Sequence, residues 1–333
     1  MYVFSRTPTA AIIDSQSLRA ADTVSADDVG SDGGKDPAVA LHRLCLTDPR
    51  SSHPDRPGQF LAGGAPWFLT LFGRDALWAA RMLLLLGTDL AAGTLRTLAR
   101  RQDAVTDPAT EEQPGKIVHE VRRAALRIAD RLSLPPVYYG TVDATPLWIT
   151  LLHDAWRWGT APAEVEELLP HAEAALAWMR EAADASGDGF LKYVDQTGHG
   201  LSNQGWKDSD DSIRYRGGRR AHAPIALCEV RAYAYEAARA GAALPRAFGR
   251  PGADAWEDWA DQLATRFRER FWVRTRTARS PRSPWTATAS RSTPSLPASV
   301  ISSARACSTR RRARCWPPAS PARTSTRDTA CAP

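Results

Sequence analysis

The sequence predicts an all-α fold, and two patterns carry the prediction. Apolar residues recur at the spacing of one helical face in successive segments that would make helices of about 15–20 residues. No stretch alternates between apolar and polar residues beyond about four positions, so strands should be few. With 43% hydrophobic residues among 333, the chain can build a substantial core.

Residues 1–35 are small, polar and aperiodic, and they end in a stretch rich in Gly, Asp and Ser. We expect them to be mostly disordered or to be the remnant of an upstream domain. A short helix is expected over residues 37–46, with a polar linker after it. The main folded domain should therefore span residues 36–273.

Residues 64–87 form a strongly apolar part of the chain, and Arg74 and Asp75 stand side by side within it. The apolar run over residues 76–86 is too short to span a bilayer and fits a core helix. Asp75 then lies in the first turn, where free backbone N–H groups favour a carboxylate. Because an unpaired buried charge costs several kcal/mol, the two residues are either a structural ion pair or a ligand-binding pair at a pocket rim.

Further helices are expected over residues 90–101, 141–158, 162–183, 222–240 and 253–272. Pro146 is tolerated because it lies in the first turn of its helix, whereas Pro170 should divide its segment into two helices. The aromatic residues on these helical faces are expected to pack in the core.

Residues 274–333 differ in composition from the rest of the chain, since they hold twelve Arg and one Asp but no Lys or Glu. They contribute +11 to the net charge of +6, so the remainder carries −5 and offers no basic face to nucleic acid. The segment is either a disordered basic tail or the product of a reading-frame slip near Arg274. In both cases it should not pack.

The composition also excludes several classes of protein. No apolar span of 18 residues exists and the N-terminus lacks the features of a signal peptide, so we expect a cytoplasmic protein without a membrane partner. The five cysteines show no pair at metal-ligand spacing. Residues 184–195 have the acidic spacing of a calcium loop, but Lys192 stands at a ligand position and favours a Gly-rich turn. We expect no metal and no cofactor.

The loop over residues 202–218 has the composition of a sugar-binding site. Trp206 and Lys207 are followed by three carboxylates, of which Asp208 is the first. An aromatic ring can stack on a sugar, and a carboxylic acid can protonate the leaving oxygen of a glycoside. The alternative is a solvated loop in which Asp211 or Ser212 caps the next helix.

Two further stretches carry side chains that a pocket could use. His119 and Glu120 either line a pocket rim or leave Glu120 to pair with Arg122 or its neighbour, and no further residue completes a metal site. Asp143 follows Tyr139 at the start of a predicted helix, where it can also be a helix-start carboxylate and nothing more.

Five stretches, taken in order, resemble bacterial glycogen-debranching-type (amylo-alpha-1,6-glucosidase-like) glycoside hydrolases. They are GAPWFLTLFGRD, GKIVHEVR, YYGTVDATPLW, NQGWKDSDDSI and APIALCEVRAYAYEAA, and the match covers roughly residues 37–273. One such motif is weak, whereas five in sequence on predicted helical segments are specific. The resemblance implies a partial (α/α)6 toroid, with the β-sandwich that usually precedes it absent or reduced to the first few residues.

The resemblance also implies roles for individual residues. Arg74 and Asp75, in the GRD motif, would grip sugar hydroxyls in the cleavage subsite, and Asp208, in the WKD motif, would be the general acid. The other substrate contacts would be made by Trp67, Glu120, Tyr139, Asp143, Trp206 and Lys207. The substrate would be an α-glucan or oligosaccharide, hydrolysed with inversion at α-glucosidic linkages such as α-1,6 branch points. Inverting enzymes use a second carboxylate, about 6.5–9.5 Å from the acid, to activate water.

The chain departs from the family in its C-terminal part. The general base is expected beyond Val273, where the sequence contains no Glu and only Asp328 as an acid. We therefore expect a truncated chain that is inactive or poorly folded, because acid and base act on opposite ends of one displacement. An incomplete toroid should also expose apolar helix faces. The alternative is a carbohydrate-binding protein without catalytic activity.

Overall fold

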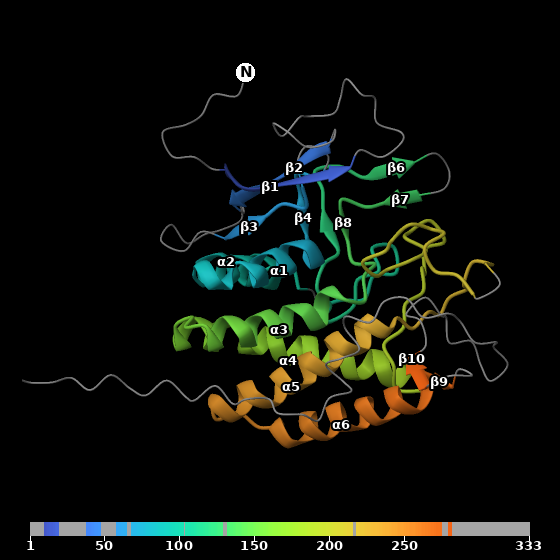
Figure 1. The fold of residues 1–333 in the computed structure, drawn as a ribbon. Helices are drawn as coiled ribbons and strands as arrows, with labels where there is room; N and C mark the ends of the chain where they lie inside the picture. Colours follow the sequence, from blue (N-terminus) through green and yellow to red (C-terminus); the bar gives the residue numbers. More distant parts are fainter. Residues whose placement is uncertain are drawn as a thin grey trace, which may run out of the picture.

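The computed structural model describes residues 10–19, 38–47, 58–64, 68–102, 104–128, 132–215, 218–274 and 279–281. Within these ranges the fold is mostly α (Figure 1), but its ten strands exceed the few expected from the all-α prediction. The α-helices are α1 (Gly73–Met82), α2 (Asp89–Ala99), α3 (Ala144–Arg157), α4 (Pro162–Ala185), α5 (Cys228–Ala247) and α6 (Ala253–Arg270), and a 3-10 turn, η2 (Leu84–Leu86), follows α1.

The strands form small antiparallel sheets, and those described after β2 are only two or three residues long. One sheet has the order β1-β2-β3, a second has the order β4-β5-β8, and β6 pairs with β7 and β9 with β10. Their bounds are β1 (Ala10–Arg19), β2 (Ala38–Thr47), β3 (Gln59–Leu61), β4 (Leu71–Phe72), β5 (Glu120–Val121), β6 (Leu126–Ile128), β7 (Leu132–Leu134), β8 (Val137–Tyr138), β9 (Trp272–Arg274) and β10 (Arg279–Pro281).

The helices are arranged as three successive hairpins, α1–α2, α3–α4 and α5–α6, whose two members pack on each other. The first helices of the hairpins are also neighbours, since α3 packs against both α1 and α5 (Figure 1). Glycine makes two of the turns possible: Gly159, between α3 and α4, has φ 107°, and Gly252, at the start of α6, has φ 97°. The hairpins therefore bring the starts of α1, α3 and α5 to one end of the molecule.

The core lies between these helices. Trp148 of α3 is fully buried, and its indole N–H donates a hydrogen bond of 3.1 Å to the carbonyl oxygen of Leu95 in α2. Leu77 of α1 and Leu152 of α3 are also almost fully buried. Each large apolar side chain of this kind contributes about 1.5–3 kcal/mol when it leaves water. The apolar faces read from the sequence are thus the faces that hold the hairpins together.

The helix predicted over residues 37–46 is wrong, because the structure has strand β2 there. β2 pairs antiparallel with β1 on one side and with β3 on the other. Backbone pairing with two neighbours outweighs the modest helix preference of its Ala and Leu residues. Residues 10–19 likewise form β1 and are not irregular, whereas the rest of residues 1–35 lies outside the described ranges.

Two helix predictions need smaller corrections. Pro170 does not divide its segment, because α4 runs through it without a break. Pro170 is exposed, so water can reach the carbonyl that lost its partner, while the opposite face of α4 stays buried in the core. α5 begins at Cys228, later than the predicted residue 222, because Pro224 disfavours helical backbone just before it.

The basic C-terminal segment is described only at Arg274 and in β10, and the expectation for its other residues lies outside the described ranges. β10 pairs with β9, so this short part does form backbone contacts, contrary to the prediction. Among the described helices, none combines the length and the apolar character needed to cross a bilayer.

Candidate functional site

A group of charged side chains gathers where α1, α3 and α5 begin. Arg74 and Asp75 lie in the first turn of α1, Asp143 directly precedes α3, and Glu229 lies in the first turn of α5. Asp208 joins them from the loop between α4 and α5, since its charge acts on Arg74. We call these five residues the helix-start cluster. Helix N-termini carry a positive partial charge, which favours carboxylates at this position.

Backbone contacts hold the start of α1 against residues 118 and 119. The N–H of Gly73 donates a hydrogen bond of 2.8 Å to the carbonyl oxygen of His119. A Cβ atom at Gly73 would lie 2.1 Å from the carbonyl oxygen of Val118, so only glycine permits this approach. The GRD motif therefore places Arg74 at a fixed distance from the segment that carries His119 and Glu120.

Arg74 is the only basic member of the helix-start cluster, and it is 8% exposed. Its Nη1 donates a hydrogen bond of 3.2 Å to Oδ2 of Asp143, and its Nε lies 3.7 Å from Oδ2 of Asp75. Asp143 also accepts a hydrogen bond of 2.7 Å from the hydroxyl of Thr141. Burial opposes the charge of Arg74, but Asp143, Asp75 and Asp208 together raise the pKa of its guanidinium.

Asp208 is exposed to solvent, as a group that contacts a ligand must be. Partial burial raises the pKa of its carboxyl; Arg74 opposes this effect, and the negative charges of Asp75 and Asp143 add to it. The net result is a carboxyl that holds its proton to a higher pH than an ordinary aspartate. Such a group suits the donation of a proton to a leaving oxygen.

Glu229 was assigned no role from the sequence, yet it is 7% exposed and belongs to the helix-start cluster. Its Oε2 atom is buried and has no hydrogen-bond partner among the described residues. Burial raises the pKa of Glu229, and the charge of Asp143 raises it further. The available signal was an acidic residue in the first turn of an apolar helix, the pattern that also marked Asp75.

Tyr233, one turn beyond Glu229 in α5, was also missed. Burial raises the pKa of its hydroxyl, and Asp143 and Glu229 contribute to that rise. The phenol therefore stays protonated and can donate or accept a hydrogen bond beside the two carboxylates. Its ring packs edge-on against Trp78, with 5.9 Å between centroids, which fixes its orientation.

Glu120 forms the ion pair with Arg122 that was one of the two interpretations left open by the sequence. Its Oε2 lies 2.8 Å from Nη2 of Arg122 in an ion pair, while its Oε1 is buried without a hydrogen-bond partner among the described residues. Glu120 pairs with Phe72 across the β4–β5 ladder, directly beside the start of α1. One oxygen of Glu120 is thus held by Arg122, and the role of Glu120 at a pocket rim stays a prediction.

His119 is buried beside Glu120, between the rings of Phe72 and Tyr138. Burial and the nearby charges of Arg74 and Arg122 hold the pKa of His119 well below its usual range, so the ring is neutral. No group of three potential metal ligands occurs in the described part of the chain.

The remaining predicted site residues do not all reach the cluster. Tyr139 is buried in the core, and its hydroxyl donates a hydrogen bond of 2.5 Å to the carbonyl oxygen of Arg101, so it does not line an open site. Trp206 is 51% exposed, and the amine of Lys207 lies 5.1 Å from the centre of its ring. Both directly precede Asp208 in the chain. Trp67 lies outside the described residues.

The predicted Gly-rich turn is present at residues 184–195. The hydroxyl of Ser186 donates a hydrogen bond of 2.8 Å to Oδ1 of Asp188, and the amine of Lys192 lies 2.8 Å from Oδ2 of the same carboxylate. Gly187 and Gly189 both have φ 72°. The lysine thus takes the place that a cation would need, in line with the sequence interpretation.

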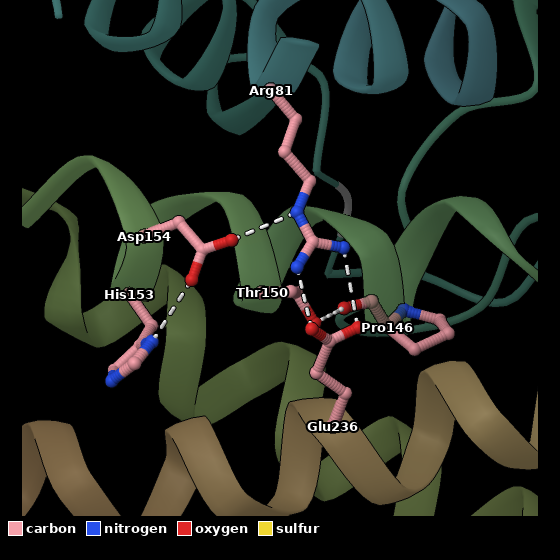
Figure 2. Close-up of polar contacts among 6 residues, drawn as sticks. All are labelled: Arg81, Pro146, Thr150, His153, Asp154 and Glu236. Atoms are coloured by element: carbon pink, nitrogen blue, oxygen red, sulfur yellow. Dashed lines mark hydrogen bonds and ion pairs between the residues drawn. The ribbon is translucent and has the colours of Figure 1, made fainter. Parts of the chain in front are cut away.

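A second charged group lies further along the same three helices. Arg81 of α1 donates hydrogen bonds of 2.8 Å to Asp154 of α3 and of 2.5 and 3.2 Å to the two carboxylate oxygens of Glu236 in α5 (Figure 2). His153 lies 3.2 Å from the other oxygen of Asp154. We call these four residues the distal cluster. It links three helices through one guanidinium.

A comparison of the chain with protein-family models and with the sequences of curated proteins gives no match. The functional interpretation therefore depends on the geometry described above and on the resemblance of the five motifs.

Proposed function

We propose that this protein is a glycoside hydrolase of carbohydrate metabolism that acts on α-glucosidic linkages, with Asp208 as the general acid. The observation that carries the proposal is the gathering of Arg74, Asp75, Asp143 and Asp208 at the starts of the helices, with a raised pKa at Asp208. The resemblance adds the substrate class, α-1,6 branch points of glycogen or related glucans. Such a substrate would be met in the cytoplasm and requires no membrane or nucleic-acid partner.

The proposed reaction uses each member of the cluster differently. Asp208 gives its proton to the glycosidic oxygen as the bond from that oxygen to the anomeric carbon breaks. Arg74 and Asp75 hold sugar hydroxyls by charge-assisted hydrogen bonds, and the exposed ring of Trp206 stacks on a sugar face. Water attacks the anomeric carbon from the opposite side and gives its proton to a second carboxylate, which inverts the configuration.

The proposed architecture is a partial (α/α)6 toroid. The three helical hairpins support it, since their first helices α1, α3 and α5 are successive neighbours as inner helices of a toroid would be. Exposed apolar side chains at the end of α1 and in η2 also support it: Met82, Leu85 and Leu86 are 67%, 69% and 73% exposed. An incomplete ring would leave such side chains uncovered.

The second candidate function is saccharide binding without hydrolysis. Glu229 is a buried carboxylate of the helix-start cluster and could be considered as the general base. Its raised pKa, however, disfavours the ionised form that a general base needs. The general base expected beyond Val273 falls in the part of the chain that the structure hardly describes. A chain with the acid and the binding groups alone would bind the sugar and leave it intact.

The test compares Asp208→Asn with Asp210→Asn. Asp210 lies in the same loop and pairs with Arg220 at 3.0 Å at the surface, so its variant is a matched control. With isomaltose and a branched glucan as substrates, Asp208→Asn should lower turnover by about 10²–10⁴-fold, and Asp210→Asn should change it little. NMR of the first product gives the anomeric configuration.

Equal turnover in the two variants would remove Asp208 from the role of acid. Sugar binding without turnover in the wild-type chain, measured by calorimetry, would select the non-catalytic alternative. Absence of both binding and turnover would contradict the proposed function altogether.

A further inference from the structure

A cavity of about 510 Å³ opens beside the C-terminal end of α4, and no member of the helix-start cluster lines it. Most of its walls come from the loop over residues 106–116, the last turns of α4 and the turn over residues 192–196, and Gln204 and Pro224 add to them. Thr141 and Val142, just before α3, form the wall nearest to Asp143. Its size is that of an ordinary small-molecule site.

Lys116 is the unusual group in this cavity, because its side chain lines it and is 5% exposed. An ammonium has three N–H donors, and one of them donates to the carbonyl oxygen of Glu111 over 3.1 Å. The other two have no acceptor among the described residues. The amine also lies 5.8 Å from the centre of the Trp178 ring, which forms part of the cavity wall.

Glu111, in the same loop as Lys116, is held in a fixed conformation. It has φ 58°, a left-handed conformation that costs a residue other than glycine of order 1 kcal/mol and often occurs at functional sites. Its carboxylate accepts hydrogen bonds of 2.9 Å from the hydroxyl of Tyr138 and of 2.7 Å from the amide of Gln204. Glu111 is therefore held by the protein, whereas the amine of Lys116 keeps donors for a ligand.

The lining indicates the class of that ligand. Its charged side chains are two acids and two lysines, so the cavity carries no net charge. Amide groups of Gln113, Gln196 and Gln204 and several hydroxyls also line it, together with the aromatic rings of Trp178 and Tyr193. A neutral cavity with amide donors, amide acceptors and an indole wall suits the hydroxyls and the apolar ring face of a sugar.

We propose that this cavity is a second saccharide-binding site, in which Lys116 donates hydrogen bonds to sugar hydroxyls and Trp178 borders the ring. The site stands on its own lining and does not require the hydrolysis proposed for the helix-start cluster. It would hold part of a glucan at a distance from Asp208.

The experiment measures how a sugar protects Lys116 from acetylation in the full-length chain. Burial lowers the pKa of Lys116 to about 8, so its amine is partly unprotonated near that pH and reacts with an acetylating reagent. Mass spectrometry of the digested protein gives the labelling rate of this residue. The probes are maltotriose, isomaltose and inorganic phosphate, and the Asp208→Asn variant is used so that neither sugar is hydrolysed.

Three variants locate the effect. Ala182→Phe should fill the mouth of the cavity and abolish protection, because Ala182 lines it on the half-buried side of α4. Ala177→Phe places the same ring on an exposed part of α4 away from the cavity and should leave protection unchanged. Lys116→Met keeps the length of the side chain and should weaken sugar binding, measured by calorimetry, by about tenfold through lost hydrogen bonds.

Protection of Lys116 by either sugar, lost in Ala182→Phe and kept in Ala177→Phe, is the expected result. Labelling that neither sugar slows at high millimolar concentration would overturn the proposal. Protection by phosphate alone would also overturn it, since the site would then bind anions. Protection of Lys116 that survives Ala182→Phe unchanged would place the sugar elsewhere. None of these outcomes depends on turnover, so the two proposals can fail separately.

Discussion

The helix-start cluster and the distal cluster are built on the same three helices, but they balance their charges differently. In the distal cluster, the guanidinium of Arg81 bonds both oxygens of Glu236 and one of Asp154, and His153 lies at the other (Figure 2). In the helix-start cluster, Arg74 is the one basic group among four carboxylates. The charges of the distal cluster are paired within the protein, whereas the helix-start cluster has more carboxylates than its one guanidinium can pair.

The pKa values follow this difference. Hydrogen bonds from His153 and Arg81 lower the pKa of Asp154 against the effect of burial, as in a structural ion pair. Burial and like charges raise the pKa of Asp208 and of Glu229. A surplus of carboxylates, one of them buried with an oxygen that no described residue bonds, is typical of a site that binds a ligand. The same helices can thus carry a structural link and a binding site.

The largest effect on stability is expected from Arg74→Met. This change should lower the free energy of unfolding by about 3–5 kcal/mol, because buried Asp143 loses its charged partner. Urea denaturation followed by circular dichroism measures it. The control is Arg246→Met, since Arg246 pairs with Glu257 and Asp254 at the surface and its loss should change stability little. An equally small effect in both variants would show that Arg74 does not hold the cluster together.

A smaller loss is expected from Arg81→Met. The change should cost about 1 kcal/mol, because the ion pairs are bonded but partly exposed to solvent and therefore screened. Added salt should lessen the difference between the wild type and this variant. A loss greater than that of Arg74→Met would reverse the contrast between the two clusters.

An effect of similar size, and the one with the clearest sign, concerns pH. Because the folded state raises the pKa of Glu229 above its ordinary value of 4.5, it binds this proton more tightly than the unfolded chain does. The wild type should therefore lose stability relative to Glu229→Gln as the pH rises above 4.5, with a gain for the variant of about 1 kcal/mol near neutral pH. Urea denaturation at several pH values measures the difference.

Asp154→Asn provides the opposite case. The folded state lowers the pKa of Asp154 below 3.8, so this carboxylate contributes stability above that pH and loses its contribution as the pH falls through the folded-state value. Asp154→Asn should thus be destabilising at neutral pH and nearly neutral in strong acid. The same pH dependence in Glu229→Gln and Asp154→Asn would contradict the distinction between the clusters.

Local pattern was enough to predict much of the helical fold. The helices α2, α3 and α6 begin and end within a few residues of the predicted segments, and Asp75 lies in the first turn of α1 as expected. Periodicity of apolar residues depends only on neighbours three or four positions apart, so the chain carries it locally. The predictions failed where a distant segment decided the outcome, as in β2, which pairs with β1 and β3.

In the candidate site, too, some residues could be predicted from local pattern and others could not. Sequence motifs marked Arg74, Asp75, Asp143 and Asp208, and the structure brings these four together. Tyr139 was marked as well, but packing turns it into the core. Glu229 carried only the local signal of its first-turn position, whereas its closeness to Asp143 and the cavity around Lys116 arise only where separate segments meet.

The sequence by itself determined that this protein is mostly helical, which faces of its helices are apolar, and which charged residues stand at helix starts. These properties arise from side chains close together in the chain. Only the tertiary structure decided which carboxylates share one guanidinium, which oxygen is left without a partner and where a cavity opens. Those properties depend on burial and on charges from distant segments, which no local pattern records.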